Sequence, residues 1–145
     1  MKLIYSGYFY KFEKNSFNIL LNEFLKNFNI SKNFILFIHS VDDKKSRELN
    51  KKLFNKNYPT DVLTVPIYSN LNQINKLSNE NNEVIGDIFL NRSLIKVNAK
   101  KFNKLLSEEF QLVLLHGLLH IIGYSHNQQS QLTNIENKIL NKVWS

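Results

Sequence analysis

The spacing of apolar residues alternates along the chain between patterns typical of strands and of helices. Leu3–Phe9 is rich in aromatic residues and has no helical spacing, which favours a strand. Apolar residues then recur every three or four positions over Ser16–Asn29, which predicts an amphipathic helix. Asn33–His39 is a short apolar run suited to a buried strand, and the charged stretch Asp42–Phe54 predicts a second helix. The chain therefore begins with two strand–helix pairs.

The next segments differ in how much of their surface they can bury. In the helix expected over Asp42–Phe54, Leu49 and Leu53 would form a single buried stripe. Asp61–Tyr68 supplies β-branched residues typical of a strand. Pro66 cannot donate a hydrogen bond to a neighbouring strand, so this strand is expected near the edge of its sheet.

The second half of the chain is mainly helical. Asn70–Asn82 is polar and weakly periodic, which predicts an exposed loop with a short helical turn. Glu83–Asn91 is typical of a further strand, and a helix is expected from Ser93 onward. Another helix opens at Ser107, with two acidic residues in its first turn, and a final one covers Gln131–Val143. With 145 residues and no internal repeat or Pro- or Gly-rich linker, residues 1–145 are expected to form one domain.

Composition limits the partners and the metal chemistry. Hydrophobic residues make up 43% of the chain, enough for a core, and the formal net charge of +7 favours polyanionic partners such as nucleic acid. A Lys-rich solvated surface arising from compositional bias explains the same charge equally well. Because there is no cysteine, disulfides and thiolate ligands are excluded, and His, Asp and Glu are the candidate metal ligands.

No segment has the pattern of an export signal or a membrane span. Polar residues interrupt the apolar ones over Met1–Tyr10, and the longest apolar run, Leu112–Ile122, contains two histidines. That run has about half the length that a bilayer requires and is expected to be a buried helix. We expect a cytoplasmic protein without a membrane partner.

Three of the four histidines lie within eleven residues, in the segment HGLLHIIGYSH. On a helix, His116 and His120 lie one turn apart on the same face, close enough to share one metal ion. Gly123 can adopt the left-handed conformation that ends a helix, so the chain can return His126 to the same ion. Three imidazoles leave a fourth position of a tetrahedral zinc open, which is typical of catalytic sites.

Other interpretations of this cluster are weaker. Core histidines with ordinary partners remain an alternative, but burying unpaired imidazoles costs roughly a few kcal/mol that a shared metal removes. The identity of the metal stays open, because nickel, copper and iron also accept imidazole ligands. The spacing matches a zincin helix, yet Gly117 stands where a metallopeptidase places its glutamate base, which disfavours peptide hydrolysis. A glycine there would instead let a strand or substrate backbone approach closely.

These residues resemble the YbeY family of bacterial rRNA-maturation endoribonucleases, whose signature is H-G-x-L-H-L-x-G-Y-D-H. Two further family blocks occur in the expected order, namely Leu49-Asn50 followed by Tyr58–Thr64, and then Ile85–Ile88. The resemblance implies an α/β (α+β) fold, with a small mixed, mostly parallel sheet of about four strands covered by helices and a zincin-like metal helix. It also implies one Zn²⁺ per chain on His116, His120 and His126.

The function implied by the resemblance is metal-dependent cleavage of single-stranded RNA. In this family the activity serves 16S rRNA 3′-end maturation and ribosome quality control, so the expected partners are single-stranded RNA, rRNA and the small ribosomal subunit, and not DNA. Lys51, Lys52 and Lys56 are the candidate RNA-binding residues, each able to neutralise a phosphate as a point charge. No residue is assigned as the catalytic acid or base.

Two departures from the family pattern keep other functions open. Phe54 occupies the position of a family Arg that is suited to clamping phosphate, and Ser125 replaces the Asp before the last histidine. A non-catalytic ribosome-assembly factor with a structural zinc is therefore an alternative, and a metallohydrolase of small substrates is another. Asp87 is expected to be a structural turn or cap acceptor, and His39 an ordinary histidine. The N-terminal aromatic residues could stack on RNA bases, but their spacing favours core packing.

Overall fold

The computed structural model describes residues 1–30, 33–77 and 82–145. Within these residues the strands form one four-stranded sheet in the order β1-β2-β4-β3. The strands are β1 (Lys2–Ser6), β2 (Ile35–Val41), β3 (Val62–Pro66) and β4 (Val84–Asn91). Neighbouring pairs are parallel except that β3 runs antiparallel to β4. This arrangement confirms the small, mostly parallel sheet, and β3 lies at the edge that Pro66 predicted.

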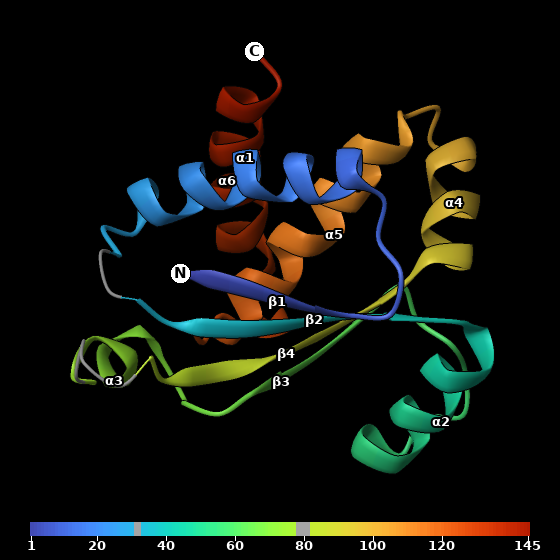
Figure 1. The fold of residues 1–145 in the computed structure, drawn as a ribbon, viewed down its shortest axis with the longest axis horizontal. Coiled ribbons are helices and arrows are strands. Elements are labelled where there is room, and N and C mark those ends of the chain that lie inside the picture. Colours follow the sequence, from blue (N-terminus) through green and yellow to red (C-terminus); the bar gives the residue numbers. More distant parts are fainter. Residues whose placement is uncertain (31–32, 78–81) are drawn as a thin grey trace.

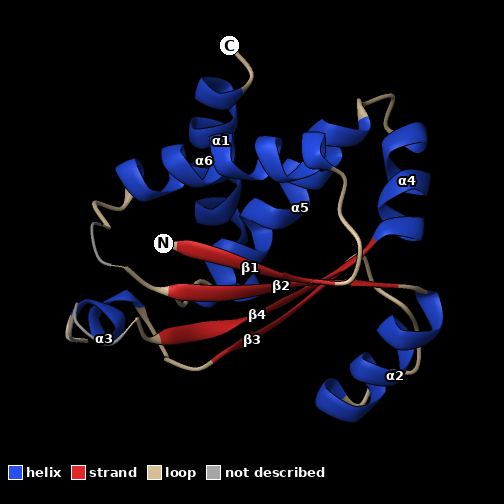
Figure 2. Cartoon of the chain, viewed as in Figure 1, coloured by secondary structure: helices blue, strands red, loops and turns tan. Residues whose placement is uncertain are grey.

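The helices lie mainly on one side of this sheet. Figures 1 and 2 show α1, α4, α5 and α6 on that side, with α2 and α3 near the two ends of the other. The elements are α1 (Lys11–Asn27), α2 (Asp43–Phe54), α3 (Leu71–Asn75), α4 (Arg92–Lys101), α5 (Leu106–Ile121), the 3₁₀ turn η1 (His126–Gln128) and α6 (Gln129–Val143). No helix among the described residues has the length and apolar character needed to cross a membrane.

The central helix of the fold is α5. Its leucines, including Leu114 and Leu118, are buried, because the helix contacts β3, β4, α1, α4 and α6. Gly117 brings it directly onto the sheet, since a Cβ there would lie 3.0 Å from the Ile88 side chain and 3.2 Å from that of Thr64. The buried character predicted for this helix is confirmed, and the glycine does permit the close approach of two strands.

The N-terminal elements differ from expectation in their bounds. The first strand ends at Ser6, because Gly7 turns the chain with a φ of +82°. Helix α1 begins at Lys11, earlier than its apolar spacing indicated. The Glu13 carboxylate accepts a hydrogen bond from the Tyr10 backbone N–H at 2.8 Å, which caps the helix before the first apolar turn.

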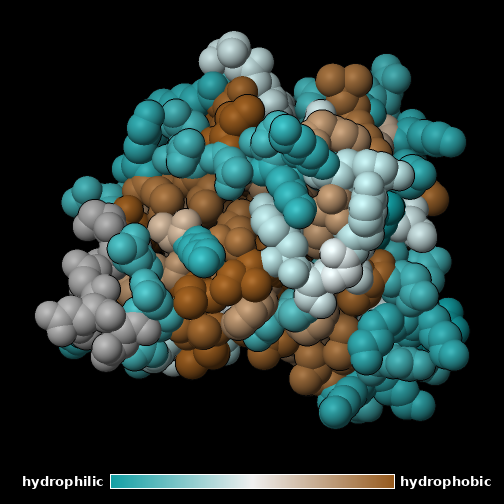
Figure 3. Space-filling view, viewed as in Figure 1, coloured by the Kyte–Doolittle hydropathy of each residue, from teal (hydrophilic) through white to brown (hydrophobic). Residues whose placement is uncertain are grey.

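Helix α2 corrects the stripe expected from its leucines. Leu53 is 42% exposed, whereas Ser46 and Asn50 are buried. Both polar side chains bond to the backbone of the loop that follows, Ser46 to Thr60 and Asn50 to Tyr58. The helix is therefore attached to the fold by hydrogen bonds on its buried side. Its other side chains make a largely hydrophilic surface at the lower right of Figure 3.

The structure also tests the expectations for the N-terminal aromatic residues, which are only partly met, and for the short helical turn in Asn70–Asn82, which is confirmed. Phe9 packs into the core as expected, but the neighbouring Tyr8, Tyr10 and Phe12 are about half exposed or more. The segment Asn70–Asn82 contains α3, which is anchored by the fully buried Ile74, and its residues 78–81 lie outside the described part of the chain.

Candidate metal centre

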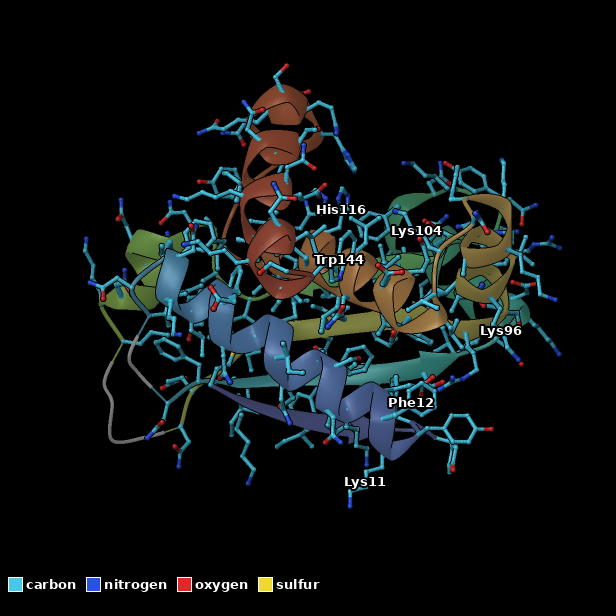
Figure 4. All side chains as sticks on the ribbon, turned by 90° about the horizontal axis from the view of Figure 1, so that it is seen from above. Lys11, Phe12, Lys96, Lys104, His116 and Trp144 are labelled. Atoms are coloured by element: carbon cyan, nitrogen blue, oxygen red, sulfur yellow. The ribbon has the colours of Figure 1, made fainter. Side chains whose placement is uncertain are left out.

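Helix α5 brings the first two candidate ligands together. His116 and His120 lie one turn apart, and their Nε2 atoms are 3.0 Å from each other. Figure 4 shows His116 where α6 passes beside α5. Both side chains are half-buried, because the helix below them is packed into the core while their own face opens to a groove.

A sharp turn after α5 supplies the third histidine. Gly123 has a φ of +109°, and a Cβ there would lie 2.7 Å from the Ser69 carbonyl oxygen, so both the backbone conformation and the space require glycine. The chain then starts η1 at His126. One ligand atom from each of the three histidines lies within 4.8 Å of the others. In the described part of the chain no other group of His, Asp or Glu side chains meets this criterion.

Hydrogen bonds at the other ring nitrogens orient two of the imidazoles. His116 Nδ1 lies 2.8 Å from a Glu136 carboxylate oxygen, and His120 Nδ1 lies 2.7 Å from the Tyr124 carbonyl oxygen. Both partners are acceptors, so each Nδ1 carries the proton and donates it. Each Nε2 is then left with a lone pair, and two lone pairs that face each other at 3.0 Å suit a shared cation. The residues thus fit a metal ion.

The surroundings shift the pKa values of these two histidines in opposite directions. The hydrogen bond to Glu136 raises the pKa of His116 above its ordinary value, while burial lowers the pKa of His120. The lowered value favours the neutral imidazole that binds metals. The negative charge of Glu136 would in turn balance part of the charge of a bound cation.

Sequence reasoning missed Glu136, which lies on α6, twenty positions after His116. Periodicity carries no sign of this contact, because it depends on how α6 packs across α5. One signal was available: Glu136 is the only acidic residue on the C-terminal side of Glu109. A lone carboxylate on a helix that follows a histidine cluster is a reasonable candidate for orienting a ligand.

The three histidines lie in a groove with a volume of about 620 Å³. Its walls come from the end of α2 and the following loop, from β3, from one face of α5 and from the turn before η1. Besides the histidines, the charged and aromatic side chains lining it are Phe54, Lys56, Tyr58, Asp61, Glu109 and Tyr124. The groove can therefore offer a ligand metal-binding nitrogens, one ammonium group, carboxylates and aromatic rings together.

The structure separates the three candidate RNA-binding lysines. Lys56 lines the groove. Lys51 and Lys52 are exposed in the last turn of α2 and are not among the groove-lining residues. Only Lys56 is thus placed to contact a phosphate inside the groove, while the other two add positive charge beside it.

Glu109 is a second acidic residue whose position was not foreseen. It is 3% exposed, and its Oε2 atom has no hydrogen-bond partner, although Lys104 Nζ lies 3.8 Å away. Burial raises the pKa of this carboxyl group. From sequence it was only an acid in the first turn of a helix, whereas the fold turns it into the groove.

Asp87 is neither a turn acceptor nor a cap, because it lies in the middle of β4. Its carboxylate is 2.7 Å from His39 Nε2 on the neighbouring strand, and the His39 ring stacks on Phe89 with 4.3 Å between centroids. Neither residue lines the groove that holds the three histidines, and their structural role stays a prediction.

The family model described as endoribonuclease YbeY matches residues 10–143. The chain belongs to the YbeY family. An endoribonuclease YbeY of Borreliella burgdorferi is 38% identical over 98 residues, which cover 64% of this chain and 61% of that protein. The chain thus spans about three fifths of the length of that relative. An endoribonuclease YbeY of Acholeplasma laidlawii is 28% identical over 137 residues, which cover 92% of this chain and 91% of that protein.

A solved structure supports the fold independently of these relatives. The solution structure of a Thermotoga maritima protein superposes with a TM-score of 0.63 at 21% identity, covering 99% of this chain and 89% of that one. Phe54 and Ser125 both line the groove that holds the three histidines. The two departures from the family pattern are therefore located at the candidate site itself.

Proposed function

We propose that this YbeY-family protein is a zinc-dependent endoribonuclease that cuts single-stranded RNA. We further propose that it acts in the cytoplasm on the small ribosomal subunit, in maturation of the rRNA 3′ end and in ribosome quality control. Membership of the family supports RNA as the substrate. The observation that carries the proposal is the pair of Nε2 atoms of His116 and His120, facing each other at 3.0 Å inside a groove.

In this proposal His116, His120 and His126 hold one zinc ion per chain. A zinc ion bound there supplies a Lewis acid for a phosphate and lowers the pKa of water. Glu136 and the Tyr124 carbonyl keep the protons of His116 and His120 on Nδ1, so that both Nε2 lone pairs stay directed into the groove. Because imidazole nitrogens also bind nickel, copper and iron, these metals are chemically acceptable substitutes.

The lysines supply the attraction for RNA in this proposal. Lys56 would neutralise a phosphate within the groove, and Lys51 and Lys52 would steer the strand toward it. These contacts carry no base information and have no bidentate geometry, so they position a backbone without selecting a sequence. A formal net charge of +7 supports the same partner.

Elemental analysis combined with an RNA cleavage assay tests the proposal. We expect about one zinc per chain in the wild type and loss of both zinc and cleavage in His120→Ala, because one of the three nitrogen donors is gone. Cleavage should be seen on single-stranded RNA and not on a duplex of the same sequence. Zinc at the wild-type level in His116→Ala would disprove the ligand assignment.

A second function is favoured by Phe54 and Ser125, which occupy groove positions where the family pattern has Arg and Asp. With neither side chain present, the protein could be a ribosome-assembly factor whose zinc only stabilises the fold. A protein that binds zinc and RNA but cuts no RNA, even after removal and reloading of the metal, would establish this alternative.

A further inference from the structure

Two exposed aromatic rings lie in the groove that holds the histidines. Phe54 is 46% exposed and Tyr58 is 53% exposed, and both line the groove. Single exposed apolar residues are common on protein surfaces and require no explanation. Phe54 and Tyr58, however, share a groove with His116 and His120. Lys56 also lines this groove and lies between the two aromatic residues in the sequence.

The loop that carries these rings is firmly attached to α2. Asn55 ends the helix in the left-handed conformation, with a φ of 57°. The buried Asn50 side chain donates a hydrogen bond of 2.8 Å to the Tyr58 carbonyl oxygen. The buried Ser46 hydroxyl donates to the Thr60 carbonyl oxygen at 2.8 Å and accepts from the Thr60 N–H at 2.9 Å. The backbone beneath both rings is therefore fixed before a ligand arrives, which lowers the entropy cost of binding.

The other polar groups of the groove favour a nucleobase beside the rings over a further phosphate. The carboxylates of Asp61 and Glu109 line the same groove and would repel a phosphate. The partly exposed Asp61 carboxylate can instead accept hydrogen bonds from the amino or imino groups of a base. Exposed rings beside a lysine are the combination with which proteins hold single-stranded nucleic acid, because every base has a face that can stack.

We propose that Phe54 and Tyr58 form a stacking site for an unpaired base of the RNA, adjacent to the histidine cluster. This inference rests on the proposed function and specifies how the groove would select its substrate. A base paired within a duplex is already stacked on its neighbours and cannot lie against either ring. The site would thus favour single strands through the bases, where the lysines contribute only charge.

Binding to two matched oligoribonucleotides tests the stacking site. One is a short single strand. The other has the same sequence with one nucleotide replaced by an abasic residue, and the measurement is repeated with the abasic residue at each successive position. Binding is measured on the metal-loaded protein at low temperature, and gel electrophoresis checks that the RNA stays intact. Circular dichroism checks that each protein remains folded. Phe54→Leu and Tyr58→Leu remove a ring but keep apolar bulk. Phe12→Leu is the control, because Phe12 is 51% exposed and lies well away from His116 in Figure 4.

We expect Phe54→Leu and Tyr58→Leu each to weaken RNA binding by about fivefold to a hundredfold, which corresponds to the free energy that one stacked base contributes. The salt dependence of the binding constant should not change. The wild type should prefer the intact strand over the abasic one at one position, and the two variants should lose that preference. Phe54→Tyr and Phe12→Leu should behave like the wild type. Lys56→Ala should reduce the salt slope by roughly one and weaken both strands equally.

Two results would overturn the proposal in distinguishable ways. If the wild type cuts single-stranded RNA and both leucine variants keep its affinity and its preference for the intact strand, the stacking site is refuted and the proposed function stands. If the wild type neither binds nor cuts RNA, the proposed function fails and the stacking site fails with it.

Discussion

Removing the Glu136 carboxylate should weaken metal binding, although Glu136 is not itself one of the candidate ligands. Its oxygen lies 2.8 Å from His116 Nδ1, and its side chain is 13% exposed, so water cannot easily replace it. In Glu136→Ala the imidazole of His116 loses both its orientation and the nearby negative charge. Helix α6 should persist, because alanine is favourable in a helix interior.

The size of the effect follows from what such partners contribute in other metal sites. Loss of a hydrogen-bonding partner of a ligating histidine typically costs 10- to 100-fold in metal affinity, which corresponds to about 1.4 to 2.7 kcal/mol. Glu136→Gln should lie between the wild type and Glu136→Ala, because an amide oxygen still accepts the Nδ1 proton but carries no charge. His120 keeps its own bond to the Tyr124 carbonyl in both variants, so binding should be weakened and not abolished.

A competition titration measures this effect directly. Zinc is partitioned between the protein and a coloured chelator of known affinity, at constant pH, for the wild type and each variant. Glu48→Ala, which removes an exposed carboxylate from α2, controls for the change in net charge. Equal zinc affinity in Glu136→Ala and the wild type would refute the orienting role. A loss in Glu48→Ala of the same size would show that only long-range charge matters.

Three further predictions concern stability. Arg92→Ala should lower the free energy of unfolding by about 3 to 5 kcal/mol, because it leaves the fully buried Glu13 carboxylate without its cation. A loss below about 1 kcal/mol, measured by urea denaturation, would contradict this. Because the pKa of Glu109 is raised, the folded state binds the carboxyl proton more tightly than the unfolded state does. The free energy of unfolding should therefore fall as the pH rises from the ordinary pKa of 4.5 through the raised pKa of the folded state. Glu109→Gln should flatten that decline and add about 1 kcal/mol at neutral pH, and identical pH profiles of Tm would rule this out. Gly117→Ala should cost about 1 to 3 kcal/mol, since its Cβ would lie 3.0 Å from Ile88, and wild-type stability in denaturant would show that α5 shifts freely.

The candidate metal-binding segment could be predicted from sequence because its geometry is local. His116 and His120 share a face through the helical period alone, and Gly123 is the residue type that permits the turn back to His126. The apolar character of the same segment also predicted correctly that the helix is buried. Each of these inferences depends on residues at most ten positions apart, where backbone geometry leaves few choices.

The rest of the site was decided by packing between distant segments. Glu136 reaches His116 only because α6 crosses α5, and Arg92 meets Glu13 across 79 positions of the chain. The start of α1 is set by the hydrogen bond between the Glu13 carboxylate and the Tyr10 backbone, and not by the spacing of apolar residues. Likewise, the buried side of α2 proved to be polar because Asn50 had a loop carbonyl to bind. Periodicity says which side of an element is apolar, whereas the partner that a buried polar group finds depends on the tertiary arrangement.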